Sequence, residues 1–360
     1  MKVAFALEHY EPHVGGAEKL FSDLAAALVA RGVEVRVVTS DSGGVSGTIM
    51  TDGVQVQYHP WRSLFGHPIA HGADLEPHVA WANVVLTSQY TAAPATAAVA
   101  RRLDRPCVFI AYEFLGKRWR LVESPLRARA FAAFERWVFA KPYDQFIAIS
   151  EATARDLIAG GRDPAKVVTI QPVFNDFADW RAIPNLGAGG HTFLYYGRPG
   201  RTKGVAVLLE AIARATPTLP PQWRFELILS DDPAREKRAA VQTVDRNGLE
   251  ARVTIEDSMP LAALRERLST AFCVIVPSLT EGFGFSAYQA CCIGKNIIST
   301  DAGSLPEVVS GRSIVVPHGD AGALAAAIEA ATRDEFDTRP DRVPRDGAER
   351  IIALCESLRR

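Results

Sequence analysis

Short apolar runs alternate with helical patterns along this chain, and no other feature constrains its fold as strongly. Residues 2–7 form an apolar run, residues 17–31 carry apolar side chains at helical spacing, and residues 33–39 return as a valine-rich run. A strand, a helix and a strand in this order predict a parallel sheet. Further strands are expected near residues 54–58, 84–87, 107–111 and 145–149.

A second series of the same kind starts at Thr192. Residues 192–196 form an apolar run, a glycine-rich loop follows, and residues 204–215 have a helical pattern. Residues 175–190, between the two series, are rich in glycine and proline and are expected to form a linker. Strands are expected near residues 224–229, 252–256, 272–276, 296–299 and 313–316.

The two series predict an α/β protein with two Rossmann-like domains facing each other across a cleft. The length of 360 residues agrees, since domains average about 150 residues. The expected division is a first domain over residues 1–174, a second over 175–345, and a last helix over 346–360 that crosses back to the first. Ligands of such sheets bind outside the carboxyl ends of the strands.

Composition excludes several classes of protein. The formal net charge is −1, which argues against a nucleic-acid binder. The five cysteines form no Cys-x-x-Cys pair and are odd in number, so we expect no disulfide framework and a reducing compartment. The apolar run at the N-terminus is too short for a signal peptide, and no run of 18 apolar residues predicts a membrane span.

Three loops have residue types that suit an anionic or polar ligand. Gly15 and Gly16 follow the first predicted strand and open a helix, where a phosphate can approach free N–H groups. A tight entry turn into the helix is the alternative. Neither Gly-x-Gly-x-x-Gly nor a phosphate-loop motif is present, which disfavours a nicotinamide enzyme and a phosphate-loop ATPase.

The second loop, residues 197–204, carries Arg198, Arg201 and Lys203 between a strand and a helix. Cations in such a loop can hold a diphosphate, although a solvated basic loop is equally consistent. The third loop follows the strand that ends at Val276. Its Glu281, the N–H groups of residues 282–285 and Gln289 on the next helix could bind hydroxyls, whereas a solvent-exposed glutamate is the alternative.

In this order and separation, the segments resemble the retaining GT-B glycosyltransferases of family four, the glycosyl transferases of group 1. The resemblance covers nearly the whole chain. The segments that carry it are Gly15-Gly16-Ala17-Glu18, Ile149-Ser150-Glu151-Ala152-Thr153, Gly197-Arg198 with Lys203-Gly204, Pro277-Ser278 with Glu281-Gly282-Phe283-Gly284, and residues 299–309.

The resemblance implies transfer of a sugar, with retention and without a metal or other cofactor, from a nucleotide-diphosphate donor. The first domain would bind the acceptor and the second the donor. Arg198 and Lys203 would hold the diphosphate, and Glu281 would bind donor-sugar hydroxyls. Donor contacts are also implied for Gly15, Gly16, Gly282, Phe283 and Gly284.

The chain departs from the family pattern at two places. The second carboxylate of the family's Glu-x7-Glu, which binds the ribose, is replaced by Gln289; an amide can still bind hydroxyls but loses about 1–2 kcal/mol of charge-assisted strength. Where many members have a His-Asp-like pair, this chain has Tyr112 and Glu113. These two residues either contact the acceptor or simply pack against the domain surface.

A basic, aromatic-rich segment over residues 117–141 allows two interpretations. Residues 100–141 contain ten Lys/Arg and four acids, a local balance of 10 − 4 = +6. An interfacial helix that meets anionic lipid is one interpretation, and a helix that covers the sheet with solvated arginines is the other. The first would place the protein on the inner face of the cell membrane, with a lipid-linked acceptor.

We therefore expect a cytoplasmic or peripherally membrane-bound hexosyltransferase of bacterial cell-surface glycan synthesis, with a glycan or lipid-linked acceptor. The alternative is a non-catalytic nucleotide-sugar or glycan-binding protein with a degenerate site, which Gln289 and the missing His-Asp pair favour. A nucleotide-sugar epimerase on the same fold would need a carboxylate set that the sequence does not show.

Overall fold

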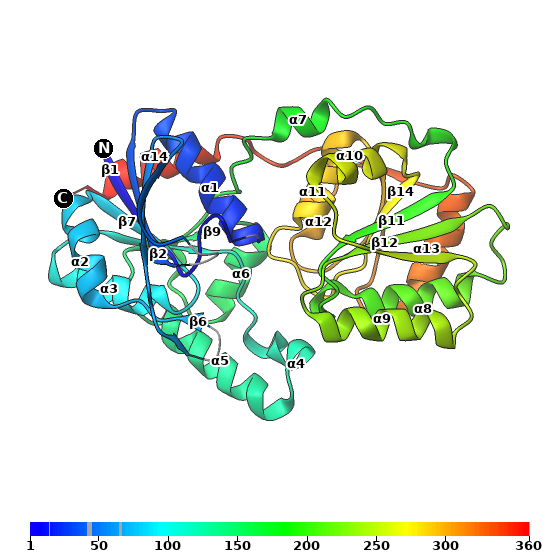
Figure 1. The fold of residues 1–360 in the computed structure, drawn as a ribbon, viewed down its shortest axis with the longest axis horizontal. Coiled ribbons are helices and arrows are strands. Elements are labelled where there is room, and N and C mark those ends of the chain that lie inside the picture. Colours follow the sequence, from blue (N-terminus) through cyan, green and yellow to red (C-terminus); the bar gives the residue numbers. More distant parts are fainter. Residues whose placement is uncertain (14, 42–44, 65–66, 360) are drawn as a thin grey trace. The chain divides into compact units, whose positions relative to one another are not determined.

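The computed structural model of the chain describes residues 1–13, 15–41, 45–64 and 67–359 (Figure 1). The chain divides into two units. Unit 1 contains Met1–Asn175 and Pro344–Arg360, and unit 2 contains Asp176–Val343. Each unit has its own sheet and its own helices.

The main sheet of unit 1 has the strand order β10-β9-β8-β7-β1-β2-β4-β3, and only the β3–β4 pair is antiparallel. β7 and β8 are buried along their whole length, as expected for strands with helices on both faces. The strands are β1 (Lys2–Ala6), β2 (Glu34–Ser40), β3 (Gly47–Thr51), β4 (Val54–His59), β7 (Val84–Ser88), β8 (Cys107–Ala111), β9 (Gln145–Ala148) and β10 (Val167–Thr169); β5 (Ser63–Leu64) pairs with β6 (His67–Pro68).

The helices of unit 1 connect successive parallel strands along the chain. Ser150 caps one of them, since its Oγ accepts a hydrogen bond from Thr153 N at 3.0 Å. The helices are α1 (Gly16–Val29), α2 (Gly72–Trp81), α3 (Ala92–Arg102), α4 (Trp119–Val122), α5 (Pro125–Phe139), α6 (Glu151–Ala159) and α14 (Gly347–Leu358), with 3₁₀ turns η1 (Gly116–Arg118) and η2 (Pro164–Lys166).

The sheet of unit 2 has the order β13-β12-β11-β14-β15-β16-β17, with only β16–β17 antiparallel. Its first six strands follow the doubly wound Rossmann order. The strands are β11 (Thr192–Gly197), β12 (Arg224–Leu229), β13 (Val253–Asp257), β14 (Cys273–Val276), β15 (Asn296–Thr300), β16 (Gly311–Val316) and β17 (Asp337–Arg339). The helices are α7 (Phe177–Arg181), α8 (Val205–Ala215), α9 (Ala234–Arg246), α10 (Leu261–Thr270), α11 (Phe285–Ile293), α12 (Leu305–Val308) and α13 (Ala321–Thr332), with 3₁₀ turns η3 (Gly187–Gly189) and η4 (Arg201–Lys203).

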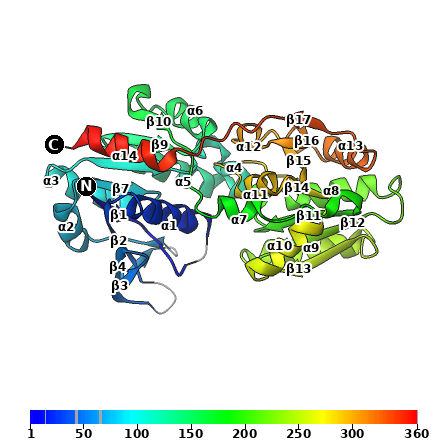
Figure 2. The same ribbon diagram turned by 90° about the horizontal axis from the view of Figure 1, so that it is seen from above.

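The C-terminal helix α14 belongs to unit 1, where it lies beside α1 (Figure 2). Arg31 at the end of α1 donates to Glu349 Oε1 at 2.6 Å, and Arg350 donates to the carbonyl of Thr169 at 2.8 Å. A Cβ on Gly347 would lie 2.6 Å from the carbonyl oxygen of Gln171, so only glycine allows the helix to begin this close to the chain after β10. These contacts attach the last helix to unit 1.

The segment expected to be a linker is partly anchored in unit 2 by a buried lysine. Lys295 is 1% exposed, and its Nζ donates to Asn185 Oδ1 at 2.7 Å and to the carbonyls of Ser269 and Ala271 at 2.6 and 2.7 Å. Burial lowers the pKa of Lys295 to about 8. Three donors meeting three acceptors tie the stretch before β11 to the edge of the sheet.

The α/β class predicted from the sequence is confirmed, and each predicted strand has an observed counterpart shifted by at most two residues. The sequence pattern did not indicate β3, β10 and β17, which are short and lack buried positions along their length. All five cysteines are free thiols. None of the helices in the described part of the chain is long and apolar enough to cross a membrane.

A buried histidine makes the stability of unit 1 sensitive to pH. His78 on α2 is 8% exposed, and its Nδ1 has no hydrogen-bond partner among the described residues. Burial lowers its pKa to about 4, with further lowering by His59 and Arg36 and a smaller opposing effect of Asp74. The folded state therefore keeps this ring neutral, whereas the unfolded chain binds a proton below about pH 6.5.

We predict that unfolding free energy falls as the pH is lowered from about 6.5 towards 4, with His78 contributing on the order of 2 kcal/mol of that loss. Urea unfolding followed by tryptophan fluorescence at several pH values should show a smaller loss in His78→Phe. His71→Asn changes an exposed ring at the start of the same helix and should keep the wild-type profile. Equal losses in wild type and His78→Phe would contradict this role.

Candidate functional site

The strand order of unit 2 reverses between β11 and β14, and the loops after these strands meet at the reversal. Strands β11 and β14 are parallel neighbours, so both carboxyl ends lie at one edge of the sheet. Leu279 N in the second loop donates to the carbonyl of Thr202 in the first, at 2.7 Å. The basic loop and the Glu281 loop, separate in the sequence, are therefore joined by the backbone.

An ion pair links the two loops. Lys203 Nζ donates to Glu281 Oε1 at 2.7 Å, although the residues are 78 positions apart, and Ser278 Oγ donates to the same oxygen at 2.8 Å. The Glu281 side chain is 8% exposed and that of Lys203 is 29% exposed. A carboxylate this buried needs charged and polar donors, and both surround it here.

Arg198 lies in the first loop but is not part of this ion pair. Its side chain is exposed and makes no ion pair with any described residue. Tyr195 OH donates to the carbonyl of Arg198 at 2.8 Å, which fixes the backbone at the end of β11. Its guanidinium is thus available for a ligand anion while its backbone is held in place.

Two glycines allow the chain to approach itself closely around Glu281. Gly204 has φ +71°, and a Cβ there would lie 1.9 Å from the carbonyl oxygen of Pro277. Gly303 has φ +52°, and a Cβ there would lie 2.1 Å from the carbonyl oxygen of Glu281, to which Ser304 N donates at 3.1 Å. Both loops are therefore held in shape by contacts that no side-chain-bearing residue could make.

The second predicted hydroxyl-binding position, Gln289, lies one turn into α11. Helix α11 begins after Gly284, which has φ +87° and whose Cβ would meet Leu305, while Phe283 is buried and packs near Phe285 and Tyr288. Gly282 and Phe283 complete the turn between Glu281 and this helix. Glu281 and the start of α11 are thereby placed on one continuous turn.

Gln289 is hydrogen-bonded to a tyrosine of β11. Tyr196 OH lies 3.1 Å from Gln289 Oε1 and 2.9 Å from the carbonyl of Ser286, and burial raises the pKa of this phenol. A phenol has one hydrogen, so it donates to one of these oxygens at a time. With the amide turned by a half-rotation, Gln289 Nε2 donates to Tyr196 while Tyr196 donates to Ser286, an arrangement that a carboxylate at position 289 could not make.

In unit 1 the strand order reverses between β1 and β7, and two polar residues that the sequence motifs did not indicate lie there. Glu8 Oε1 accepts from Tyr90 N at 2.8 Å and from Thr91 Oγ1 at 2.6 Å, at the start of α3. Gln89 Oε1 accepts from the N–H groups of Tyr112 and Glu113 at 3.0 and 3.1 Å. Their signal was a polar residue directly after a predicted strand.

The backbone around Tyr112 and Glu113 is thus fixed by Gln89. Tyr112 OH also donates to the carbonyl of Gln89 at 3.1 Å, and burial raises the pKa of Tyr112. Both side chains are half-buried. The phenol of Tyr112 points back to its own domain, so its direct contact with an acceptor would require it to leave Gln89.

At the start of α1, a carboxylate lies where a phosphate was expected. Gly15 precedes the helix in an extended conformation, and a Cβ on it would lie 2.2 Å from Glu18 Oε2. Glu18 is 8% exposed and its Oε1 is 2.8 Å from His13 Nδ1. Gly16, the first residue of α1, and Gly15 therefore make room for Glu18, whose charge suits the positive end of the helix.

Within the described ranges, no group of three or more His, Cys, Asp or Glu residues is arranged to hold a metal ion.

Family models match both halves of the chain. "Glycosyl transferase 4-like domain" matches residues 15–172, and "Glycosyl transferases group 1" matches residues 190–334. The chain belongs to the group 1 glycosyl transferases. It is a GT-B glycosyltransferase of the family-four type, and its two sheets are the two Rossmann-like domains of that fold. The family predicted from the sequence motifs is confirmed.

Relatives of this glycosyltransferase cover most of its length. GDP-mannose:cellobiosyl-diphosphopolyprenol alpha-mannosyltransferase of Xanthomonas campestris is 24% identical over 94% of this chain and 90% of its own. The phosphatidylinositol N-acetylglucosaminyltransferase protein of Arabidopsis thaliana is 24% identical over 92% of this chain and 74% of its own. The structure of Anabaena HepE with UDP-glucose has a TM-score of 0.71 at 19% identity, covering 100% of this chain and 95% of its own.

We predict that Gly204→Ala lowers the unfolding free energy of this glycosyltransferase by at least about 2 kcal/mol, because the new Cβ meets the carbonyl of Pro277 at a positive φ. Gly200→Ala, in the same loop, meets nothing within 4 Å and should change stability little. Urea unfolding measures both. If the two variants were equally stable, the close approach of the two loops would be wrong.

Proposed function

We propose that this glycosyltransferase is a retaining, metal-independent hexosyltransferase that uses a nucleotide-diphosphate sugar. The observation that carries the proposal is the Lys203–Glu281 pair at the strand reversal of unit 2, with Arg198 exposed on the same loop. The pair brings an anion-binding cation and a hydroxyl-binding carboxylate within hydrogen-bonding distance of each other. A sugar diphosphate carries both complementary groups.

The proposed residue roles follow from the chemistry of each group. Arg198 and Lys203 would neutralise the charge that grows on the leaving diphosphate, which is the largest electrostatic demand of the reaction. Ionised Glu281 can only accept hydrogen bonds and would bind donor-sugar hydroxyls. The N–H groups of residues 282–284 would seat sugar and phosphate, and Gln289 would bind the ribose.

Retention would follow from attack on the face that the diphosphate leaves. The acceptor hydroxyl oxygen bonds to the anomeric carbon, the bond from that carbon to the phosphate oxygen breaks, and the departing diphosphate takes the hydroxyl proton. No enzymic nucleophile is needed. In unit 1, Gly15 and Gly16 would lie against phosphate and sugar, and Tyr112 and Glu113 would lie on the acceptor side.

The acceptor is proposed to be a glycan or a lipid-linked saccharide, and the setting bacterial cell-surface glycan synthesis on the inner face of the membrane. Support comes from the names of relatives: the Xanthomonas enzyme acts on a diphosphopolyprenol, and an Escherichia coli relative, 27% identical over 55% of this chain, is an O-antigen chain mannosyltransferase. The complex of Anabaena HepE with UDP-glucose supports a nucleotide-sugar donor.

The first test is isothermal titration with UDP, GDP, ADP and dTDP and their common sugar conjugates, with and without EDTA. We expect one nucleotide family to bind, with an affinity that EDTA does not change. Lys203→Ala should weaken that binding about ten- to a hundredfold, because a charge-assisted contact to phosphate is lost. Arg201→Ala, which removes another exposed cation of the same loop, should weaken it far less.

Thermal unfolding of Lys203→Ala accompanies the titration, since this variant leaves Glu281 without its ion-pair partner. A folded variant with unchanged nucleotide affinity would contradict the diphosphate role of Lys203. A wild-type protein that binds none of the nucleotides would favour the alternative function, a glycan-binding protein with a degenerate donor site.

A second prediction concerns the ribose. Gln289→Glu should raise nucleotide affinity about tenfold, because a carboxylate accepts more strongly from ribose hydroxyls than an amide does. The gain should disappear with the corresponding 2′,3′-dideoxynucleotide. Glu281→Ala should abolish sugar transfer in either background. An equal gain for the ribose and dideoxy forms would place residue 289 away from the ribose.

A further inference from the structure

Helix α5 of unit 1 has apolar residues on two opposite faces. The inner face contains Val138 and Phe139, both fully buried, and the ring of Phe139 lies 4.6 Å from that of Phe109 on β8. This face covers the sheet, as one interpretation of the basic segment predicted. The other face cannot be explained by packing within the described part of unit 1, because its residues are exposed.

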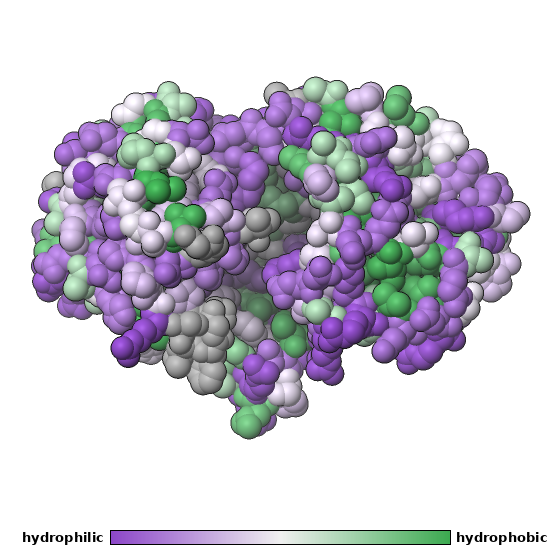
Figure 3. All heavy atoms as spheres, viewed as in Figure 1, coloured by the Kyte–Doolittle hydropathy of each residue, from purple (hydrophilic) through white to green (hydrophobic). Residues whose placement is uncertain are grey.

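The exposed face is a stripe of apolar residues at helical spacing. The outer stripe consists of Leu126, Ala130, Ala133 and Trp137, which are separated by four, three and four positions and so lie on one side of the helix. Leu126 is 79% exposed and Trp137 is 51% exposed. In Figure 3 hydrophobic atoms lie at the lower tip of unit 1, over the end of α5, next to hydrophilic ones.

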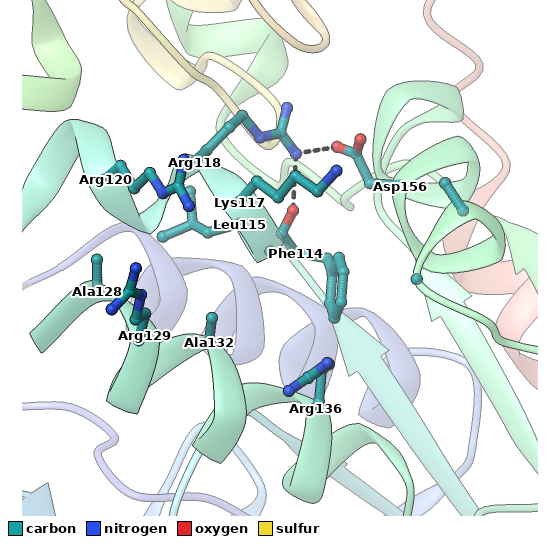
Figure 4. A pocket seen from close by; sticks show the side chains of 13 residues that line it. Phe114, Leu115, Lys117, Arg118, Arg120, Ala128, Arg129, Ala132, Arg136 and Asp156 are labelled. Carbon is teal, nitrogen blue, oxygen red and sulfur yellow. Dashed lines mark hydrogen bonds and ion pairs between the residues drawn. The ribbon is translucent and has the colours of Figure 1, made fainter. Parts of the chain in front are cut away.

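A basic pocket of about 800 Å³ adjoins one edge of this helix (Figure 4). Arg129 and Arg136 of α5 line it, and Lys117, Arg118 and Arg120 line it from η1 and α4. Its apolar lining comes from Phe114, Leu115, Ala128, Ala132 and Ala159. The pocket therefore combines five cations with an apolar floor.

The charge of the pocket is not balanced from within. Among the described residues, Asp156 of α6 is the one acid in its lining, and it forms an ion pair with Arg118, whose guanidinium also donates to the carbonyl of Phe114 at 2.7 Å. The remaining four cations form no ion pair with any residue the structure describes. Four such cations around one cavity require an anion with more than one charge.

The wall of the pocket is fixed before any ligand arrives. Glu135, on the inner side of α5, is fully buried and accepts from the N–H groups of Leu115 and Gly116 at 2.9 and 2.7 Å. The Arg118–Asp156 pair holds the same stretch against α6. These contacts fix the η1–α4 segment to α5 on one side and to α6 on the other.

We propose that this pocket binds the phosphate or diphosphate headgroup of a membrane lipid, while the outer stripe of α5 lies in the apolar layer of that membrane. A free phosphate would account for the cations but not for an exposed leucine and tryptophan on the same helix. Tryptophan is favoured at membrane interfaces, and arginines can reach headgroups while their stems stay apolar. Where the proposed function holds, the headgroup is that of the lipid-linked acceptor.

The pocket is tested by flotation with phosphatidylcholine vesicles that contain about one third phosphatidylglycerol, and with vesicles that contain none. We expect binding only to the anionic vesicles, and Arg129→Glu with Arg136→Glu should weaken it about tenfold or more. The control, Arg101→Glu with Lys166→Glu, changes the net charge of unit 1 equally at exposed residues outside the pocket and should keep most of the binding. Equal losses in both double variants would overturn the pocket.

The stripe is tested by Leu126→Ser with Trp137→Ser, against Ile49→Ser with Met50→Ser, which removes exposed apolar residues of β3. The first pair should lose vesicle binding yet keep the affinity for inorganic pyrophosphate measured by titration, and the second should lose neither. Binding of pyrophosphate without any binding to anionic vesicles would overturn the lipid proposal in favour of a soluble phosphate ligand. Nucleotide titration of the Arg129/Arg136 variant tests the donor site separately, so failure of either proposal leaves the other measurable.

Discussion

The contact between the loops after β11 and β14 is the constraint on which the candidate donor site depends. Parallel strands end at the same edge of a sheet, and the reversal of strand order leaves room there for two loops. Here the room is filled by a backbone bond from Leu279 to Thr202 and by the Lys203–Glu281 pair. Glycines at 204 and 303 are required because the carbonyls of Pro277 and Glu281 lie where a Cβ would be. The chemistry of the site thus rests on two positions that have no chemistry of their own.

The same pair also determines the energetics of ligand entry. Without a ligand, Glu281 is nearly buried and its charge is balanced by Lys203 and Ser278. A diphosphate that takes over Lys203 must leave Glu281 with new donors, and sugar hydroxyls are donors of that kind. A nucleoside diphosphate without its sugar would remove the lysine and supply no hydroxyl near the carboxylate. The coupling favours the complete sugar nucleotide over its leaving group, which is the order that a transferase needs.

The strands could be predicted from the sequence because a doubly covered parallel strand is an uninterrupted apolar run, as in β8 and β14. Strands β3, β10 and β17 could not, since their pairing depends on neighbours rather than on burial. Motif spacing indicated Lys203 and Glu281, but the direct bond between them follows from the strand order. The carboxylate of Glu18 beside Gly15 and the phenol of Tyr196 beside Gln289 depend on side-chain conformations that no pattern of residue types specifies.

Composition has the same limit in the basic segment. A local excess of arginine and aromatic residues is compatible with a helix that covers a sheet and with one that meets a lipid surface, and the sequence left both open. Helical geometry shows that α5 can serve both: Val138 and Phe139 face the sheet, while Leu126 and Trp137 lie on the opposite side. Arg129 and Arg136 stand between these faces, at the edge of the pocket. Arginines that only kept the helix soluble would be expected on its outermost face, and that face is apolar. Their position at the boundary is the arrangement that an anion held at an apolar surface requires.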